Sequence, residues 1–249
     1  MTALVDAMRA AIATDAERLA ALAESHGAVA VPTCPGWDVA RLAGHTARVH
    51  RMAISVLTNS LDGFPDADSL EKPPREPDAV PDYVRRGTAE LDAVLAQRDP
   101  SSDAWNFLNE PKRSYFWFRR MAHETAVHRW DAENAVGSTW HVGAELAVDG
   151  VDEYFVMVRE RLLAARGMAS LGGSLHLHAT DTTGEWMINV DDGVIAVSHG
   201  HGKGDAAIRG TASDLFLGLW GRFDLVNDAR FERFGSPEVI AALGTLGGT

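Results

Sequence analysis

The hydrophobic pattern of the sequence changes its period near the middle of the chain, and this change limits the possible folds more than any other feature. Up to about residue 137, apolar side chains recur every three to four positions, as they do in amphipathic α-helices. From about residue 174, short segments alternate apolar and polar side chains, which is the period of a half-buried β-strand. A chain that is helical first and sheet-rich afterwards is predicted to belong to the α+β class.

Turn and capping residues divide the first half into four helices. The segment VPTCPGW breaks the chain, and Asp38 directly after it is placed to cap the next helix. Pro81 suits the first turn of a third helix, and Gly137 ends the fourth. The predicted helices span residues 4–26, 38–60, 82–98 and 115–136, with a polar, proline-rich loop over 62–80. This arrangement favours a four-helix bundle.

The second half is predicted to contain both helices and strands. Asp191, Asp192 and Gly193 join two alternating segments and are a strong hairpin signal. Thr211 is placed to cap a later amphipathic helix. The predicted elements are a helix over 144–165, strands over 174–180, 185–191, 193–200 and 206–210, and a helix over 211–224. We place the boundary at 138–147 and expect two domains, a metal-binding helical bundle over 1–142 and a smaller α/β domain over 143–249 that closes the site.

The charge of the chain excludes several classes of function. Lysine and arginine number 23 against 35 aspartates and glutamates, a net charge of −12 that repels nucleic acids and anionic membranes. No apolar run reaches the ~18 residues of a membrane span, and the N-terminus lacks a signal-peptide pattern. Cys34 is the single cysteine, so no intrachain disulfide can form. We expect a cytoplasmic protein, monomer or homodimer, that acts on small molecules.

One predicted helix concentrates side chains that bind metals. Its segment MAHETAVHRWDAE looks like a zinc-protease helix, but a valine takes the place of the second histidine of the H-E-x-x-H motif. Glu124 and His128 are four residues apart, hence about 40° apart around the helix, and can reach one point. Arg120 and Asp131 lie on the same polar stripe. Glu124 and His128 therefore form half of a metal site.

A third ligand has to come from another helix, because bundles build metal sites from facing helices. His45, in ARLAGHTARVHRM, lies on or near an inward face, and His50 in the same segment is the alternative. His123 points about 140° away from His128 and cannot easily share a ligand with it. Two histidines and one glutamate are a known ligand set of catalytic zinc. The competing interpretation is that Glu124 and His128 are an ordinary pair on a solvated helix face.

Other reactive side chains are interpreted as structural. Cys34 is interpreted as a small buried apolar residue rather than a nucleophile or a metal ligand, and Trp37 as an anchor of the turn. Four histidines of the second half are left out of the site because no clear further partner is visible, although two of them share a strand face. They are His176, His178, His199 and His201.

The order of three segments resembles the mycothiol-dependent maleylpyruvate isomerase family. They are VPTCPGWDVARLAGH, RMAHETAVHRWDAENAVG and ELAVDGVDEYF. The later segment IRGTASDLFLGLWGR is similar to the smaller C-terminal α/β domain of that family. The resemblance covers nearly the whole chain and implies a DinB-like helical bundle in the first half.

The resemblance also implies a set of site residues. The metal triad of the family falls on His45, Glu124 and His128, the divalent ion being expected to be zinc. An arginine of the C-terminal domain is expected to reach the site, with Arg222 in LWGR as the match and Arg209 as the reserve. The competing interpretation of Arg222 is a cation at a helix C-terminus. Mycothiol is implied as thiol cofactor or co-substrate.

These ligands suggest thiol chemistry. Zinc held by two imidazoles and one carboxylate would deprotonate a thiol at its open position. That thiolate would add to an electrophile while an arginine holds the substrate carboxylate. If the thiol is then expelled, the protein is an isomerase of a maleylpyruvate-like cis-enoate. If the thiol is kept, the protein is an S-transferase. Three alternatives stay open: a metal-dependent hydrolase with His50 or Asp131 as base, a non-haem iron oxygenase, and a non-catalytic small-molecule binding or regulatory protein.

Overall fold

Helices form the first part of the chain and a sheet lies in the second, which confirms the predicted α+β class. The computed structural model describes residues 2–108, 111–158 and 170–246. Contacts divide the chain into two units, Met1–Trp140 and His141–Thr249. Within the described residues, every helix is too short or too polar to cross a membrane.

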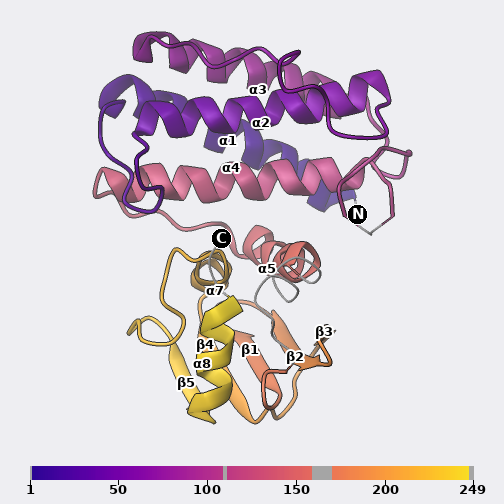
Figure 1. Cartoon of the computed structure of the whole chain (residues 1–249), viewed down its shortest axis with the longest axis vertical. Helices are drawn as coiled ribbons and strands as arrows, with labels where there is room; N and C mark the ends of the chain where they lie inside the picture. Colours follow the sequence, from indigo (N-terminus) through magenta and orange to yellow (C-terminus); the bar gives the residue numbers. More distant parts are fainter. Residues whose placement is uncertain (1, 109–110, 159–169, 247–249) are drawn as a thin grey trace. The chain divides into compact units, whose positions relative to one another are not determined.

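The first unit is a bundle of four long helices. They are α1 (Thr2–His26), α2 (Val39–Asn59), α3 (Val80–Ala96) and α4 (Tyr115–Ala135), with a 3-10 turn, η1 (Pro77–Ala79), before α3. Helix α1 packs against the other three, and α2 packs against α3 and α4. Figure 1 shows the four helices running alongside one another. The predicted bundle is therefore observed.

The ends of these helices follow the capping signals of the sequence. The Asp38 side chain accepts a hydrogen bond from the backbone nitrogen of Arg41 at 2.8 Å, as an N-cap does. Ser60 closes α2 in the left-handed conformation, with a φ of 51°. Gly137, with a φ of 72°, follows α4. Pro81 lies in the first turn of α3, which ends at Ala96, two residues before the predicted end.

The second unit is built on a five-stranded sheet. Its elements are α5 (Ala144–Val158), β1 (Leu175–Ala179), β2 (Glu185–Asp191), β3 (Val194–His199), β4 (Ala206–Gly210), α7 (Ala212–Leu219), β5 (Glu232–Gly235) and α8 (Pro237–Leu246). The strand order is β3-β2-β1-β4-β5, and only the β1–β4 pair is parallel. The predicted hairpin joins β2 and β3, with Asp192 and Gly193 at φ values of 47° and 73°.

The sheet buries one set of alternating side chains. Leu175, Leu177, Trp186 and Ile188 are fully buried, and the indole nitrogen of Trp186 donates to Asp152 of α5 at 2.7 Å. Helix α7 contacts β1 and β4 and also packs against α5 (Figure 1). The alternate residues of β1 and β2 therefore point to the other face of the sheet.

Four parts of the second unit differ from the prediction or lie beyond it. Helix α7 ends at Leu219 rather than at residue 224, because Gly221 takes a φ of 78° and the backbone nitrogen of Arg222 turns back to the oxygen of Leu217 at 2.9 Å. Strand β5 and helix α8 were not predicted. The predicted continuation of α5 from 159 to 165 lies outside the described residues.

Candidate functional site

A buried polar stripe runs along α4. Arg120 donates to Oε2 of Glu124 at 3.0 Å, and Nε2 of His128 lies 3.3 Å from Oε1 of the same carboxylate. Nδ1 of His128 donates to Asp131 at 3.0 Å. The exposed fractions of these side chains run from 21% for Glu124 to zero for Asp131. The stripe is therefore buried at Arg120 and Asp131 and half-buried at Glu124 and His128, which distinguishes it from a solvated helix face.

Helix α2 adds His45 to this stripe. Nε2 of His45 lies 3.5 Å from Oε1 of Glu124, and its ring meets the ring of His128 edge-on at 5.4 Å. One ligand atom from each of the three residues lies within 4.8 Å of the other two. The structure thus brings together His45, Glu124 and His128, the three residues predicted as metal ligands.

His50, the alternative ligand, has a different environment. Its side chain is fully buried, and Nε2 lies 2.8 Å from the hydroxyl of Thr125. That hydroxyl donates to the backbone oxygen of Met121 at 2.6 Å, so His50 donates from Nε2, and its Nδ1 has no hydrogen-bond partner among the described residues. Burial lowers the pKa of His50 to about 4. His50 is therefore a neutral interior histidine.

Glu124 has the geometry of a metal ligand. Its Oε2 is held by Arg120, whereas Oε1 faces both imidazoles. Because Nδ1 of His128 donates to the Asp131 carboxylate, Nε2 is the nitrogen left for a metal ion, a common outer arrangement around zinc ligands. Two imidazole nitrogens and one carboxylate oxygen are also the donor set of several catalytic zinc sites. The side chains present therefore fit a divalent ion.

This cluster favours the charged forms of both its carboxylate and its histidine. Burial raises the pKa of Glu124, but His128, His45 and Arg120 outweigh it and hold that pKa well below its ordinary range. Burial lowers the pKa of His128, but Glu124 and Asp131 outweigh it and raise that pKa to about 9. Without a metal ion, a proton on His128 thus balances the carboxylates around it.

The loop before α2 supports the cluster from a second side. The hydroxyl of Thr33 donates to Asp131 at 2.6 Å, and the thiol of Cys34 lies 3.8 Å from the other oxygen of that carboxylate. Trp37 packs its ring against His45, 4.9 Å between centroids. Cys34 and Trp37 also pack against the core formed by α1, α2 and α3.

Two features of this loop were not visible in the sequence. Thr33 contacts a residue 98 positions away, so its role depends on the fold, although its place in the VPTCPGW motif marked the segment. Cys34, His128 and Asp131 also form a second group of donors within 4.8 Å of one another. A metal ion bound by this second group would compete with the hydrogen bond between His128 and Asp131. The interpretation of Cys34 as a structural residue stays a prediction.

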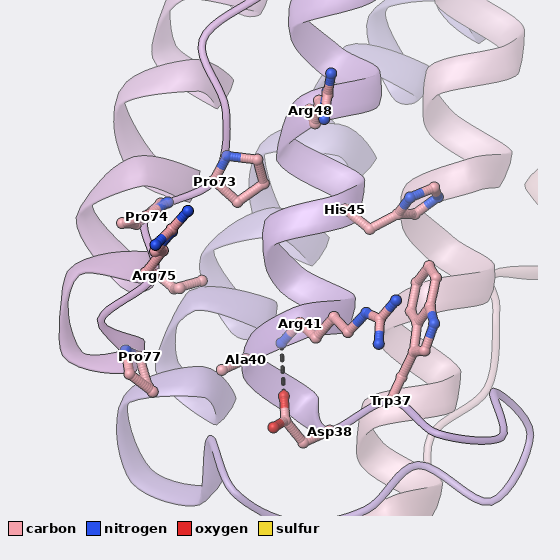
Figure 2. Close-up of a pocket in the computed structure, with 11 residues that line it drawn as sticks. Trp37, Asp38, Ala40, Arg41, His45, Arg48, Pro73, Pro74, Arg75 and Pro77 are labelled. Atoms are coloured by element: carbon pink, nitrogen blue, oxygen red, sulfur yellow. Dashed lines mark hydrogen bonds between the residues drawn. The ribbon is translucent and has the colours of Figure 1, made fainter.

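A pocket of about 410 Å³ opens beside His45. Figure 2 shows His45, Arg41 and Trp37 to one side of the α2 ribbon, with Arg75 and three prolines to the other. The guanidinium of Arg41 lies over the Trp37 ring at 5.1 Å. Arg48 also lines the pocket and donates to the backbone oxygen of residue 67 at 2.8 Å. Three arginines therefore line this pocket of an acidic protein, and Figure 2 shows Arg41 on the same side of α2 as His45, a predicted metal ligand.

The two predicted arginines of the second unit have local partners. Arg222 donates to the backbone oxygen of Trp220 at 2.7 Å and lines a hollow of about 420 Å³. Arg209 lies 3.3 Å from Glu232 on the neighbouring strand β5. The expectation that one of them acts at the metal site stays a prediction.

The histidines set aside in the second unit have a partner that the sequence did not reveal. His176, His178 and His201 surround Glu185, and one ligand atom from each of the four lies within 4.8 Å of the others. His199 instead lies 3.4 Å from Asp152.

Comparison with family models covers both units. Residues 8–133 match the mycothiol maleylpyruvate isomerase N-terminal domain, and residues 145–242 match the MDMPI C-terminal domain. No curated protein and no solved structure matches the chain. The two domain models follow one another in order and together span most of the sequence. The chain therefore belongs to the mycothiol maleylpyruvate isomerase family.

Proposed function

We propose that this protein is an enzyme that binds a divalent metal ion, zinc, through His45, Glu124 and His128. It uses mycothiol, a low-molecular-weight thiol, to isomerise a maleylpyruvate-like cis-enoate. The convergence of three ligand atoms within 4.8 Å carries the proposal, because two histidines and one glutamate match the three-ligand donor set of a catalytic zinc site. Membership of the family supports the choice of thiol.

The side chains around the ligands keep them in the form a metal needs. When bound, the ion would lower the pKa of a thiol that takes its open position. Asp131 holds the proton on Nδ1 of His128, so that the Nε2 lone pair is available. Arg120 holds one oxygen of Glu124 and leaves the other for binding. Both supports are buried, so water does not compete for these hydrogen bonds.

The arginines that line this pocket support an anionic substrate. Arg41, Arg48 and Arg75 line the pocket, and a guanidinium pairs well with a carboxylate. A local cationic pocket offsets the net charge of −12, which would otherwise repel a carboxylate. Arg222 is proposed as a further arginine needed for turnover, on the strength of the family resemblance.

The proposed reaction leaves the thiol unchanged overall. The sulfur of the thiolate forms a bond to one carbon of the cis double bond, and the π electrons move toward the conjugated carbonyl to give an enolate. The former double bond is now single and rotates. The carbon–sulfur bond then breaks, the trans double bond forms, and the thiolate is released. Arginine side chains stabilise the negative charge that develops on the enolate oxygen.

The hydrolase alternative finds little support in the geometry. Asp131 is fully buried and bonded to Thr33 and His128, so it does not reach a substrate. His50 is fully buried and bonded to Thr125. Both residues that were considered as a catalytic base are therefore engaged in the interior.

The test combines metal and thiol removal. Protein stripped of metal with a chelator is assayed with a cis-enoate and sub-stoichiometric mycothiol, with and without added Zn²⁺, while NMR follows substrate, product and thiol. We expect isomerisation only with both metal and thiol, and many turnovers per thiol. Consumption of one thiol per substrate would assign an S-transferase instead. Equal rates without thiol, or no reaction with metal and thiol present, would contradict the proposal.

A further inference from the structure

We propose a second metal site on the sheet of the second unit, formed by His176, His178, Glu185 and His201, which binds Zn²⁺. The four residues belong to a different unit from His45, and the inference does not depend on the proposed function.

Strand geometry places three of the ligands on one face. His176 and His178 are two residues apart in β1, so their side chains leave the same side of the sheet. Glu185 of β2 is the direct partner of His178 in the antiparallel register. Side chains of directly opposed residues share a face. Trp186, the next residue of β2, points into the buried core on the opposite face.

A glycine-containing turn brings the fourth ligand back to this face. Gly200 takes a φ of 106°, and its backbone nitrogen donates to the oxygen of Glu185 at 3.1 Å. A Cβ on Gly202 would come within 2.9 Å of the Met187 side chain, so the chain lies close against β2 there. Between these glycines, Nδ1 of His201 lies 2.9 Å from Oε2 of Glu185.

The distances between the Glu185 oxygens and the imidazole nitrogens are close to those between donors around a metal ion. Oε2 of Glu185 lies 3.0 Å from Nε2 of His176, and Oε1 lies 3.6 Å from Nδ1 of His178. A tetrahedral zinc ion with bonds of about 2.0–2.1 Å separates its donors by about 3.4 Å. The His176 ring meets the rings of His178 and His201 at 81° and 85°, so the imidazoles approach from different directions.

The charges around the cluster leave room for a cation. The carboxylate of Glu185 faces three imidazoles, whereas an ordinary histidine–glutamate pair contains only one. Arg209 is the residue of β4 that pairs with His178, but its guanidinium contacts Glu232 at 3.3 Å. Four donors from β1, β2 and the turn after β3 would complete the coordination of zinc, which is typical of a structural site. Bound zinc would then hold this turn against the sheet.

The test compares metal stoichiometry in full-length variants. Metal-free protein is titrated with Zn²⁺ and analysed by mass spectrometry of the metal, and with Co²⁺ to observe the absorption of a tetrahedral site. His201→Ala is the first variant, because a side chain that is 81% exposed can be removed without disturbing the core. The double variant His178→Ala/His201→Ala removes two ligands, and His199→Ala is the matched control, a histidine outside the cluster. Circular dichroism verifies that each variant is folded.

We expect the double variant to bind one equivalent of Zn²⁺ fewer than the wild type. His201→Ala should bind that equivalent more than about 100-fold more weakly, because loss of an outer partner alone lowers metal affinity about 10- to 100-fold. His199→Ala should bind as the wild type does. The same difference should appear in a His128→Ala background, which separates this site from the bundle. Equal stoichiometry and affinity in the wild type and the double variant would overturn the proposal.

Discussion

The helical unit and the sheet unit each gather histidines around one glutamate, but they use that glutamate differently. In the bundle, one oxygen of Glu124 is held by Arg120 and only the other faces imidazoles. In the sheet, both oxygens of Glu185 face imidazoles. The cluster around Glu124 contains three possible donors, and the cluster around Glu185 contains four.

The number of protein donors indicates whether a metal site is catalytic or structural. Three protein ligands leave a metal position open to a substrate, whereas four close it. The bundle also provides a buried carboxylate, Asp131, that orients His128 and is itself held by Thr33. Such supports tune the ligands of a reactive metal. If the two clusters divide these tasks, variants of one cluster should leave the other unaffected.

The largest expected effect follows from removing a bundle ligand. His128→Ala should abolish thiol-dependent turnover and the metal of the bundle, while the sheet cluster retains its Zn²⁺. Metal analysis and a turnover assay measure both. His26→Ala is the control, since that histidine lies exposed at the end of α1, outside all the donor groups found. Unchanged turnover in folded His128→Ala protein would refute the assignment of catalysis to the bundle.

Removing an arginine of the second unit tests whether that unit contributes to catalysis as well as to structure. Arg222→Ala should lower kcat/KM by about 30- to 1000-fold, the cost of ~2–4 kcal/mol of lost transition-state stabilisation. Its metal content should stay at the wild-type value. Arg209→Ala is the comparison, and a selective loss in that variant would transfer the role to Arg209. Full activity in both variants would leave the second unit without a catalytic arginine.

Acid should destabilise the protein through the neutral histidine of the bundle. The folded-state pKa of His50, about 4, lies below the ordinary value of 6.5. Between these values only the unfolded chain gains the proton, so stability is lost as the pH falls from about 6.5 to about 4, by ~3 kcal/mol in total. Denaturant unfolding of metal-free protein across this range measures the change. His50→Gln should flatten the dependence, and an unaltered slope would contradict the assignment.

Weakening the support of His128 should affect the bundle site alone. Asp131→Asn preserves the shape of the side chain but removes its charge, and loss of such an outer partner lowers metal affinity about 10- to 100-fold. Competition with a coloured chelator measures the affinity of each site. A similar loss of affinity at the sheet cluster would show that the variant acts through general destabilisation.

Cys34→Ser should have the smallest effect. The side chain packs against the core and contacts Asp131, so a serine preserves its size and most activity should remain. Steady-state kinetics with metal content as a control provide the measurement. Complete loss of activity with normal metal content would make Cys34 part of the reaction.

Local patterns in the sequence predicted local structure well. The Asp38 cap and the turn at Gly137 set helix ends close to those observed, and the angle between Glu124 and His128 depends only on helix geometry. The end of α7 was predicted too late, since the apolar pattern continues past the glycine at which the backbone turns back. Long-range contacts escaped prediction for a different reason. Glu185 reaches His178 only through strand register, which no local period specifies.

The pocket beside His45 has two walls, and each makes different contacts. One wall belongs to the loop before α2, where Trp37 contacts His45, a proposed metal ligand, and Thr33 contacts Asp131, which supports His128. An insertion or deletion there would displace both at once. The other wall, residues 73–77, includes Arg75 and belongs to the segment between α2 and α3. A change in the length or charge of that segment would therefore alter the pocket without removing the contacts that Trp37 and Thr33 make.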